Sequence, residues 1–117
     1  MKEEFDSALP LSPATLHILL SLAGEELHGY GIMQEIARQS EGKYKLGPGT
    51  LYDNLQRLIE RRWVKELGRR SGDDDPRRRY YALTAAGRGV LDAETARLAQ
   101  VVREARSRLK FLKPRRV

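Results

Sequence analysis

The sequence contains no cysteine, which excludes disulfides, thiolate zinc sites and cysteine nucleophiles. It also lacks an apolar run near the roughly 20 residues that a membrane-spanning helix needs. The longest apolar-rich stretch, residues 16–23, is interrupted by His17 and Ser21. Residues 1–7 carry more acidic than basic side chains, unlike the basic start of a signal peptide. We therefore expect a cytoplasmic protein that is neither exported nor embedded in a membrane.

Signals for a metal, nucleotide or catalytic site are equally scarce. The only histidines are His17 and His28, and a metal site needs further ligands at an organised spacing. We expect His28 to order the turn before a helix instead. Residues 47–50 lack the Lys-Ser/Thr pair of a nucleotide-binding loop, and no serine, histidine and aspartate stand in a catalytic context. We expect no enzyme, no metal and no cofactor.

Positive charge is concentrated in two parts of the chain. Its 117 residues include 22 Lys or Arg and 16 Asp or Glu, for a net charge of +6, and this length favours one domain with a small core. Residues 57–79 hold nine basic and five acidic side chains, and residues 88–117 hold nine and three. Such a field attracts polyanions, most commonly nucleic acid. A merely solvated basic surface is the alternative that charge alone leaves open.

Three helices are predicted in the first half of the chain. Ser12-Pro13 is a capping signal for a helix that Gly24 can end. A second helix is predicted from about 29 to 40, and a third from about 48 to 61. The expected apolar positions of these two helices are Tyr30, Ile32, Met33, Ile36 and Ala37, then Leu51, Leu55, Leu58 and Ile59. Residues 41–46, between them, are predicted to form a turn with at most one short strand.

A β-hairpin is predicted next. Residues 63–67 and 79–83 are rich in aromatic and β-branched side chains, which favours two strands. The polar loop between them, residues 68–78, is longer than a hairpin requires, so we expect it to project. Trp63, Tyr81 and Leu83 are expected to be core residues.

The last predicted helix runs from its cap at Thr84 to Leu112 and would be about 43 Å long. Apolar positions recur in it at spacings of four and three, with Thr95 as the one polar member. This stripe is too long to be buried on one small domain, so we expect a second subunit to cover it. Packing onto the first helix of the same chain is the alternative for part of it. The dimerisation residues are predicted to be Leu91, Leu98, Val102, Ala105, Leu109 and Leu112.

This order of elements is typical of a winged helix-turn-helix domain. The fold class is therefore mainly α with a two- to three-stranded β-wing, followed by a long C-terminal dimerisation helix. We expect the DNA-binding domain at residues 8–84, the dimerisation helix at 85–112, and flexible termini at 1–7 and 113–117.

Four segments in series resemble the PadR-like transcriptional regulators: His28-Gly29-Tyr30-Gly31-Ile32, Leu46-Gly47-Pro48-Gly49-Thr50-Leu51-Tyr52, Leu55-Gln56-Arg57-Leu58, and Arg77-Arg78-Arg79-Tyr80-Tyr81-Ala82-Leu83-Thr84 followed by Gly87. The resemblance covers about residues 9–90. It implies a DNA-binding repressor, and the single C-terminal helix is similar to that of the smaller subgroup, which dimerises through it. A homodimer is thus implied, and whether it has a small-molecule effector is left open.

The chain departs from the family pattern at two places. Relatives usually carry glycine before the first wing strand, where this chain has Arg62, so a left-handed helix end there would be strained. Drug-sensing relatives place an aromatic residue in the C-terminal helix to stack planar ligands. This chain has no aromatic residue between Tyr81 and Phe111.

One face of the predicted third helix carries hydrogen-bonding side chains and can enter the major groove. Arg57 can pair with guanine, and Asn54 and Gln56 can read adenine. Thr50 and Tyr52 suit phosphate contacts near the helix start, with a half-buried packing role as the alternative for Tyr52. The predicted recognition set is Thr50, Tyr52, Asp53, Asn54, Gln56 and Arg57.

The wing arginines are predicted to grip the DNA backbone or the minor groove. This set is Arg69, Arg70, Arg77, Arg78 and Arg79, and at least one of the last three is expected to pair with the acidic run Asp73-Asp74-Asp75. The predicted partners are thus double-stranded DNA and a second copy of the chain. The alternatives are a winged-helix module that binds proteins without DNA, and an enzyme or metal sensor of the same shape.

Overall fold

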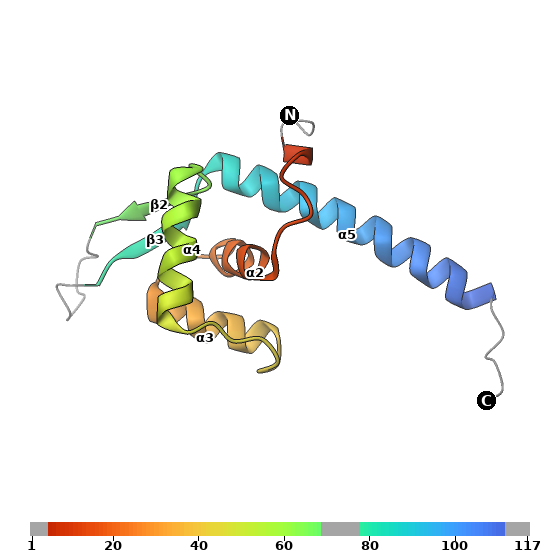
Figure 1. The fold of residues 1–117 in the computed structure, drawn as a ribbon, viewed down its shortest axis with the longest axis horizontal. Coiled ribbons are helices and arrows are strands. Elements are labelled where there is room, and N and C mark those ends of the chain that lie inside the picture. Colours follow the sequence, from red (N-terminus) through yellow and green to blue (C-terminus); the bar gives the residue numbers. More distant parts are fainter. Residues whose placement is uncertain (1–4, 69–77, 112–117) are drawn as a thin grey trace.

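The computed structural model describes residues 5–68 and 78–111 (Figure 1). Three helices, α2 (Pro13–Leu22), α3 (Gly29–Gln39) and α4 (Pro48–Glu60), precede the hairpin strands β2 (Val64–Leu67) and β3 (Tyr80–Leu83). A short strand β1 (Leu27–His28) lies between α2 and α3, and the chain continues in the long helix α5 (Ala85–Phe111). The winged helix-turn-helix arrangement is confirmed.

Side-chain caps set the starts of three helices as the sequence predicts. Ser12 Oγ accepts the Thr15 N–H at 3.2 Å, and Thr84 Oγ1 accepts the Gly87 N–H at 3.0 Å. At the start of α3, His28 Nδ1 accepts the Gly31 N–H at 3.0 Å, so this histidine orders the turn as expected. Each cap satisfies a backbone donor that has no partner within its own helix.

The core lies between the three short helices, the sheet and the first half of α5. Its buried members are Ile18, Leu19, Leu22, Ile32, Ile36, Leu51, Leu55, Leu58, Trp63, Val64, Tyr81, Val90 and Leu91. The prediction of a buried Tyr30 is wrong, because Tyr30 is 61% exposed. It lies in the first turn of α3, at the edge of the core, while Ile32 and Ile36 carry the buried face.

The sheet is antiparallel with the order β1-β3-β2, so β3 is the central strand. Tyr81 on β3 is paired with Leu27 on one side and Glu66 on the other. The third strand is therefore Leu27–His28, and residues 41–46, all of which are described, form no strand.

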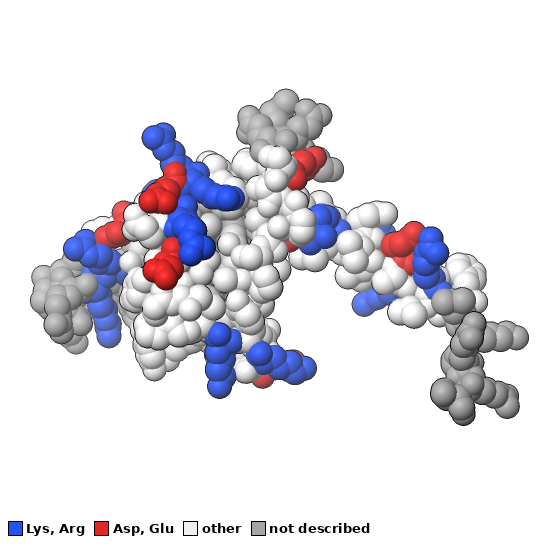
Figure 2. All heavy atoms as spheres, viewed as in Figure 1, with Lys and Arg blue, Asp and Glu red and all other residues white. Residues whose placement is uncertain are grey.

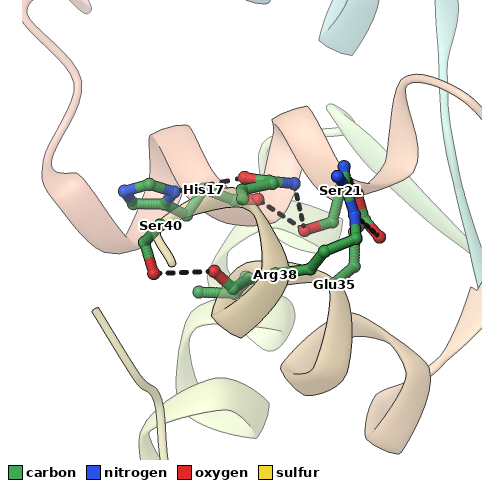
Figure 3. A network of polar contacts seen from close by, with 7 residues as sticks. His17, Ser21, Glu35, Arg38 and Ser40 are labelled. Atoms are coloured by element: carbon green, nitrogen blue, oxygen red, sulfur yellow. Dashed lines mark hydrogen bonds and ion pairs between the residues drawn. The ribbon is translucent and has the colours of Figure 1, made fainter. Parts of the chain in front are cut away.

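A polar network joins α2 to α3 (Figure 3). The ring Nδ1 of His17 lies 3.2 Å from Gln39 Oε1, and Gln39 Nε2 donates to Ser21 Oγ at 3.1 Å. Ser21 Oγ in turn donates to the backbone oxygen of His17 at 2.7 Å, and the Tyr44 ring stacks on His17. This network fixes the position of α3 against α2. Because α3 leads into the turn before α4, it also helps to position α4.

The end of α4 adopts a left-handed turn at Arg62, whose φ is +65°. The Arg62 N–H donates to Ile59 O and the Trp63 N–H donates to Leu58 O, both at 3.0 Å. This pair of bonds is the Schellman motif, which usually has glycine at the left-handed position. The left-handed conformation expected to be strained at Arg62 is therefore present. The turn places the next residue, Trp63, in the core.

Replacing Arg62 by glycine should stabilise the protein by about 0.5–1 kcal/mol, because glycine adopts this φ without a steric cost. Urea unfolding followed by circular dichroism measures the change. Arg61→Gly is the matched control, since Arg61 has helical φ and lies over the Trp63 ring at 4.8 Å. That variant should lose stability, so an equal sign for both variants would contradict the explanation.

A buried carboxylate ties the N-terminal segment to α5. Glu94 is 1% exposed, accepts the Leu11 N–H at 3.0 Å and pairs with Arg97 at 2.6 Å. Phe5 also packs against the core and lies against Gly89 of α5. The expectation of a flexible segment at residues 1–7 is thus wrong for Phe5, because an apolar ring gains by covering α5.

Glu94 should make stability depend on acid pH. The Arg97 guanidinium, followed by the Leu11 N–H, holds the pKa of Glu94 below its ordinary value of 4.5 despite burial. The stabilisation is therefore complete above that value and is lost as the pH falls through the lower pKa of the folded state. Glu94→Gln should cost about 1 kcal/mol at pH 7 and flatten the loss of unfolding free energy below pH 4.5.

Glu104→Gln serves as the control for this prediction. Glu104 pairs with Arg108 at 3.7 Å, and both side chains are largely exposed. Exposed pairs contribute little, so its acid unfolding curve should match that of the parent chain. A Glu94→Gln curve parallel to the parent's down to pH 3 would contradict the role given to Glu94.

Candidate nucleic-acid interface

The outward face of α4 carries the predicted recognition residues together. Thr50, Tyr52, Asp53, Gln56 and Arg57 are exposed, while the opposite face packs into the core through Leu51, Leu55 and Leu58. No side chain caps the helix start at Gly47 in the structure as described. The polar face is thus free to meet a partner along the whole helix.

Asn54 differs from the other members of this set because it is partly buried. Its side-chain amide donates to the Thr50 backbone oxygen at 2.8 Å. The amide nitrogen has two N–H donors and the side chain has a separate acceptor oxygen, so this bond does not by itself prevent a base contact.

A cavity of about 460 Å³ lies between α4, the start of α3 and the wing. We call it the wing-side pocket, and it is lined by His28, Gly29, Tyr30, Tyr52, Arg78, Arg79 and Tyr81. Residues from four elements therefore meet there, although they are up to 53 positions apart in the chain.

Tyr52 reaches the pocket by lying against Gly29. A Cβ atom at position 29 would overlap the Tyr52 hydroxyl, so only glycine allows this approach. Tyr52 is nevertheless 48% exposed, which fits the half-buried packing role, while its contact with phosphate stays a prediction. Tyr30 beside it is the member that sequence reasoning assigned to the core.

A second cavity, of about 270 Å³, lies on the other side of α4, beside the start of α2. We call it the α2-side pocket. It is lined by Ser12 and Thr15 from the start of α2, and by Asn54, Arg57 and Arg61 from α4. The sequence predicted both the cap at Ser12 and the arginines of α4. It did not indicate that the start of α2 and this face of α4 would be adjacent.

The two pockets therefore flank α4, and each combines arginine and hydroxyl groups with a helix N-terminus, where anions are favoured. In the view of Figure 2, lysine and arginine side chains gather over α4 and the wing, with acidic side chains among them. A helix in the major groove has a sugar–phosphate strand on either side of it, which matches this arrangement.

The structure describes only two of the five predicted wing arginines, Arg78 and Arg79. Both are exposed just before β3, and Arg79 pairs with Glu66 at 2.9 Å. Arg69, Arg70, Arg77 and the acidic run at 73–75 lie outside the described residues. The observed carboxylate partner of Arg79 thus comes from the neighbouring strand β2.

The second half of α5 projects away from the domain (Figure 1), and its residues 99–111 are all exposed. Of the predicted dimerisation residues, Val102, Ala105 and Leu109 lie on this projecting part, Leu98 is partly buried, and Leu112 lies outside the described residues. The assignment of Leu91 to a subunit interface is wrong. It is 8% exposed and packs in the core of its own chain, because α5 crosses the domain there.

Two further apolar side chains on α5 were missed by the sequence pattern. Val101 is 50% exposed and Phe111 is 79% exposed. Neither fits the spacing of four and three, although each is an apolar residue next to that stripe or at its end.

Other kinds of site find no support in the described residues. Among residues 5–68 and 78–111, no three His, Cys, Asp or Glu side chains are grouped so as to hold a metal ion. In the same ranges, no helix is both long enough and apolar enough to cross a membrane.

The chain resembles known regulators in sequence. The model of the family described as "Transcriptional regulator PadR-like family" matches residues 18–93. Transcriptional regulator Rv3488 of Mycobacterium tuberculosis is 36% identical over 96 residues, which cover 76% of this chain and 78% of that protein. An uncharacterized 37.1 kDa protein in transposon TN4556 of Streptomyces fradiae is 36% identical over 88 residues. These are 75% of this chain but 24% of the transposon protein, so the chain spans about a quarter of that protein.

Solved structures share the fold at lower identity. A PadR-like transcriptional regulator from Bacillus cereus has a TM-score of 0.70 at 19% identity, covering 94% of this chain and 99% of that one. Bacillus subtilis PadR, solved in complex with operator DNA, has a TM-score of 0.61 at 22% identity, covering 71% of this chain and 45% of that one.

Proposed function

Because the chain belongs to the PadR-like family of transcriptional regulators, we propose that it is a repressor that binds a pseudo-palindromic DNA operator as a homodimer. The α4 helix reads base edges in the major groove. The wing and the two helix N-termini beside α4 hold the backbone. The projecting half of α5 joins the two subunits.

The observation that carries this proposal is the arrangement around α4. A face of exposed hydrogen-bonding side chains lies between two pockets that hold arginine and hydroxyl groups. Phosphate contacts fix the register of a protein on the duplex, and base contacts supply the specificity. Both kinds of group occur on α4 or beside it. The operator-bound Bacillus subtilis relative has the same fold, which supports the proposal.

The exposed apolar stripe on α5 supports the homodimer. A two-fold axis through paired α5 helices would relate two copies of α4. Their half-sites would then be about one helical turn apart, roughly 34–36 Å, and the operator would be a pseudo-palindrome.

Selection of bound sequences from random duplex DNA by the full chain tests this function. We expect one enriched motif with two-fold symmetry. Its affinity should fall with salt at a log–log slope near −7, if each subunit neutralises about four phosphates. A module that binds proteins alone would enrich no motif and would leave every duplex unshifted in a gel.

Variants of α4 and of the wing should separate base recognition from binding to the DNA backbone. Asn54→Ala should relax the preference at one position of each half-site, at about 1–3 kcal/mol for the preferred base. Arg78→Ala with Arg79→Ala should weaken all sequences alike and lower the salt slope by about two per subunit. Competition gel shifts with operator variants measure both effects. A wing variant that changed sequence preference alone would reverse these roles.

A further inference from the structure

Tyr81 carries a buried hydroxyl group that has no hydrogen-bond partner among the described residues. The residue is 6% exposed and its ring packs in the core. Within residues 5–68 and 78–111, no side chain or backbone group hydrogen-bonds to this hydroxyl. Leaving such a group unpaired costs about 1–3 kcal/mol, and phenylalanine would fill the core equally well. The described residues therefore leave this hydroxyl available to a partner.

The structure directs this hydroxyl toward the wing-side pocket. Tyr81 lines that pocket together with Tyr52 and Arg79, and it interacts electrostatically with both. Burial, aided by Glu66 and Tyr52, raises the pKa of Tyr81 above its ordinary value of 10.0, although Arg79 opposes this. The hydroxyl therefore keeps its proton at neutral pH and acts as a hydrogen-bond donor.

The rest of the lining favours an anion. Arg78 and Arg79 supply guanidinium groups, Tyr52 supplies a second phenol, and the 11-residue helix α3 begins at the pocket with its positive end. The lining that the structure describes contains no carboxylate. Arg79 already pairs with Glu66 through Nη1, but a guanidinium has five N–H donors, so others are left for a ligand.

The position of the pocket identifies the anion. A helix in the major groove and a wing in the adjacent minor groove lie on either side of one sugar–phosphate strand. The wing-side pocket lies between those two elements. A phosphate of that strand is thus the anion that the docked protein would bring to it.

We propose that the wing-side pocket binds one phosphodiester of the operator in each half-site, and that the Tyr81 hydroxyl donates a hydrogen bond to its oxygen. This inference rests on the proposed function, because the phosphate belongs to the bound duplex. Tyr81 is then a DNA-binding residue within the core of the domain. The sequence pattern had predicted only a packing role for it.

Tyr81→Phe removes only the hydroxyl and tests this assignment in the full chain. Its affinity for the selected operator should fall about tenfold for each subunit, since a hydrogen bond to a charged group is lost. Its thermal stability should stay equal or rise, because no hydrogen bond among the described residues is broken. Tyr44→Phe is the matched control, since Tyr44 stacks on His17 away from the pocket, and its affinity should be unchanged.

Methylphosphonate substitution then locates the phosphate. Replacing single operator phosphates by the neutral methylphosphonate should reveal one position per half-site where the parent chain loses affinity but Tyr81→Phe loses little more. Such non-additive losses show that the hydroxyl and that phosphate act together. Additive losses at every position, or a Tyr81→Phe affinity equal to the parent's, would overturn the proposal while leaving operator binding intact.

Inorganic phosphate separates this inference from the proposed function. Amide NMR shifts of Gly29, Tyr30 and Gly31 are followed as phosphate is added to the parent chain and to Tyr81→Phe. If no duplex is ever bound, the proposed function and the phosphodiester assignment both fail. Shifts abolished by Tyr81→Phe, with operator affinity unchanged in that variant, would identify a site for a free anion and also overturn the assignment.

Discussion

Gly87→Ala should destabilise the protein by about 3 kcal/mol, the upper end of the usual cost of overpacking. A Cβ atom at position 87 would overlap the backbone oxygen of Trp63, which cannot rotate away as a side chain can. That oxygen also accepts the Thr84 N–H at 3.1 Å, so moving it would disturb the start of α5. The alanine gains about 1 kcal/mol in helix propensity, which is too little to compensate.

Urea unfolding of the parent chain and of Gly87→Ala measures this effect. The loss is a large part of the 5–15 kcal/mol typical of a domain, so the midpoint should shift strongly. Gly24→Ala is the control, because a Cβ there meets nothing within 4 Å. A cost below 1 kcal/mol for Gly87→Ala would mean that α5 can move away from Trp63 freely.

Val102→Glu combined with Leu109→Glu should convert the proposed homodimer to a monomer that remains folded. These side chains are 46% and 70% exposed within one chain, so their replacement removes little from its own core. Two buried carboxylates in each half of a helix pair would cost far more than the contact supplies. Loss of the second DNA-binding helix should then reduce operator affinity about 10²–10⁴-fold.

The measurements are mass by light scattering, helix content by circular dichroism, and affinity by gel shift. Ser107→Glu is the matched control, because it adds the same charge at an exposed position two residues from Leu109, on the opposite face of α5. That variant should remain dimeric and bind normally. A double variant that keeps the mass of two chains would show that this stripe is not the subunit contact.

The elements of this fold are predictable because their signals are local. Ser12-Pro13, His28 and Thr84 cap helices through bonds to residues three positions away, and the leucines of α4 repeat at the helical period. The left-handed turn at Arg62 was also foreseeable, through the family resemblance and the steric cost of a side chain there.

Errors arose where the identity of the neighbouring element mattered. Periodicity gives the face of a helix that is apolar, but not what covers it. Leu91 and Leu109 belong to one stripe, yet α5 crosses its own domain at Leu91 and leaves it before Leu109. Tyr30 fits the apolar period of α3, yet that end of the helix lies beyond the core.

Capping, period and charge along the chain were thus enough to predict a winged helix whose third helix has a polar face, since each depends on residues a few positions apart. The pockets beside α4 required the folded chain. Gly29 and Tyr52 meet because α3 packs against α4, and the wing carries Tyr81 to the same place. Such meetings depend on how whole elements pack, and no spacing within a single element encodes them.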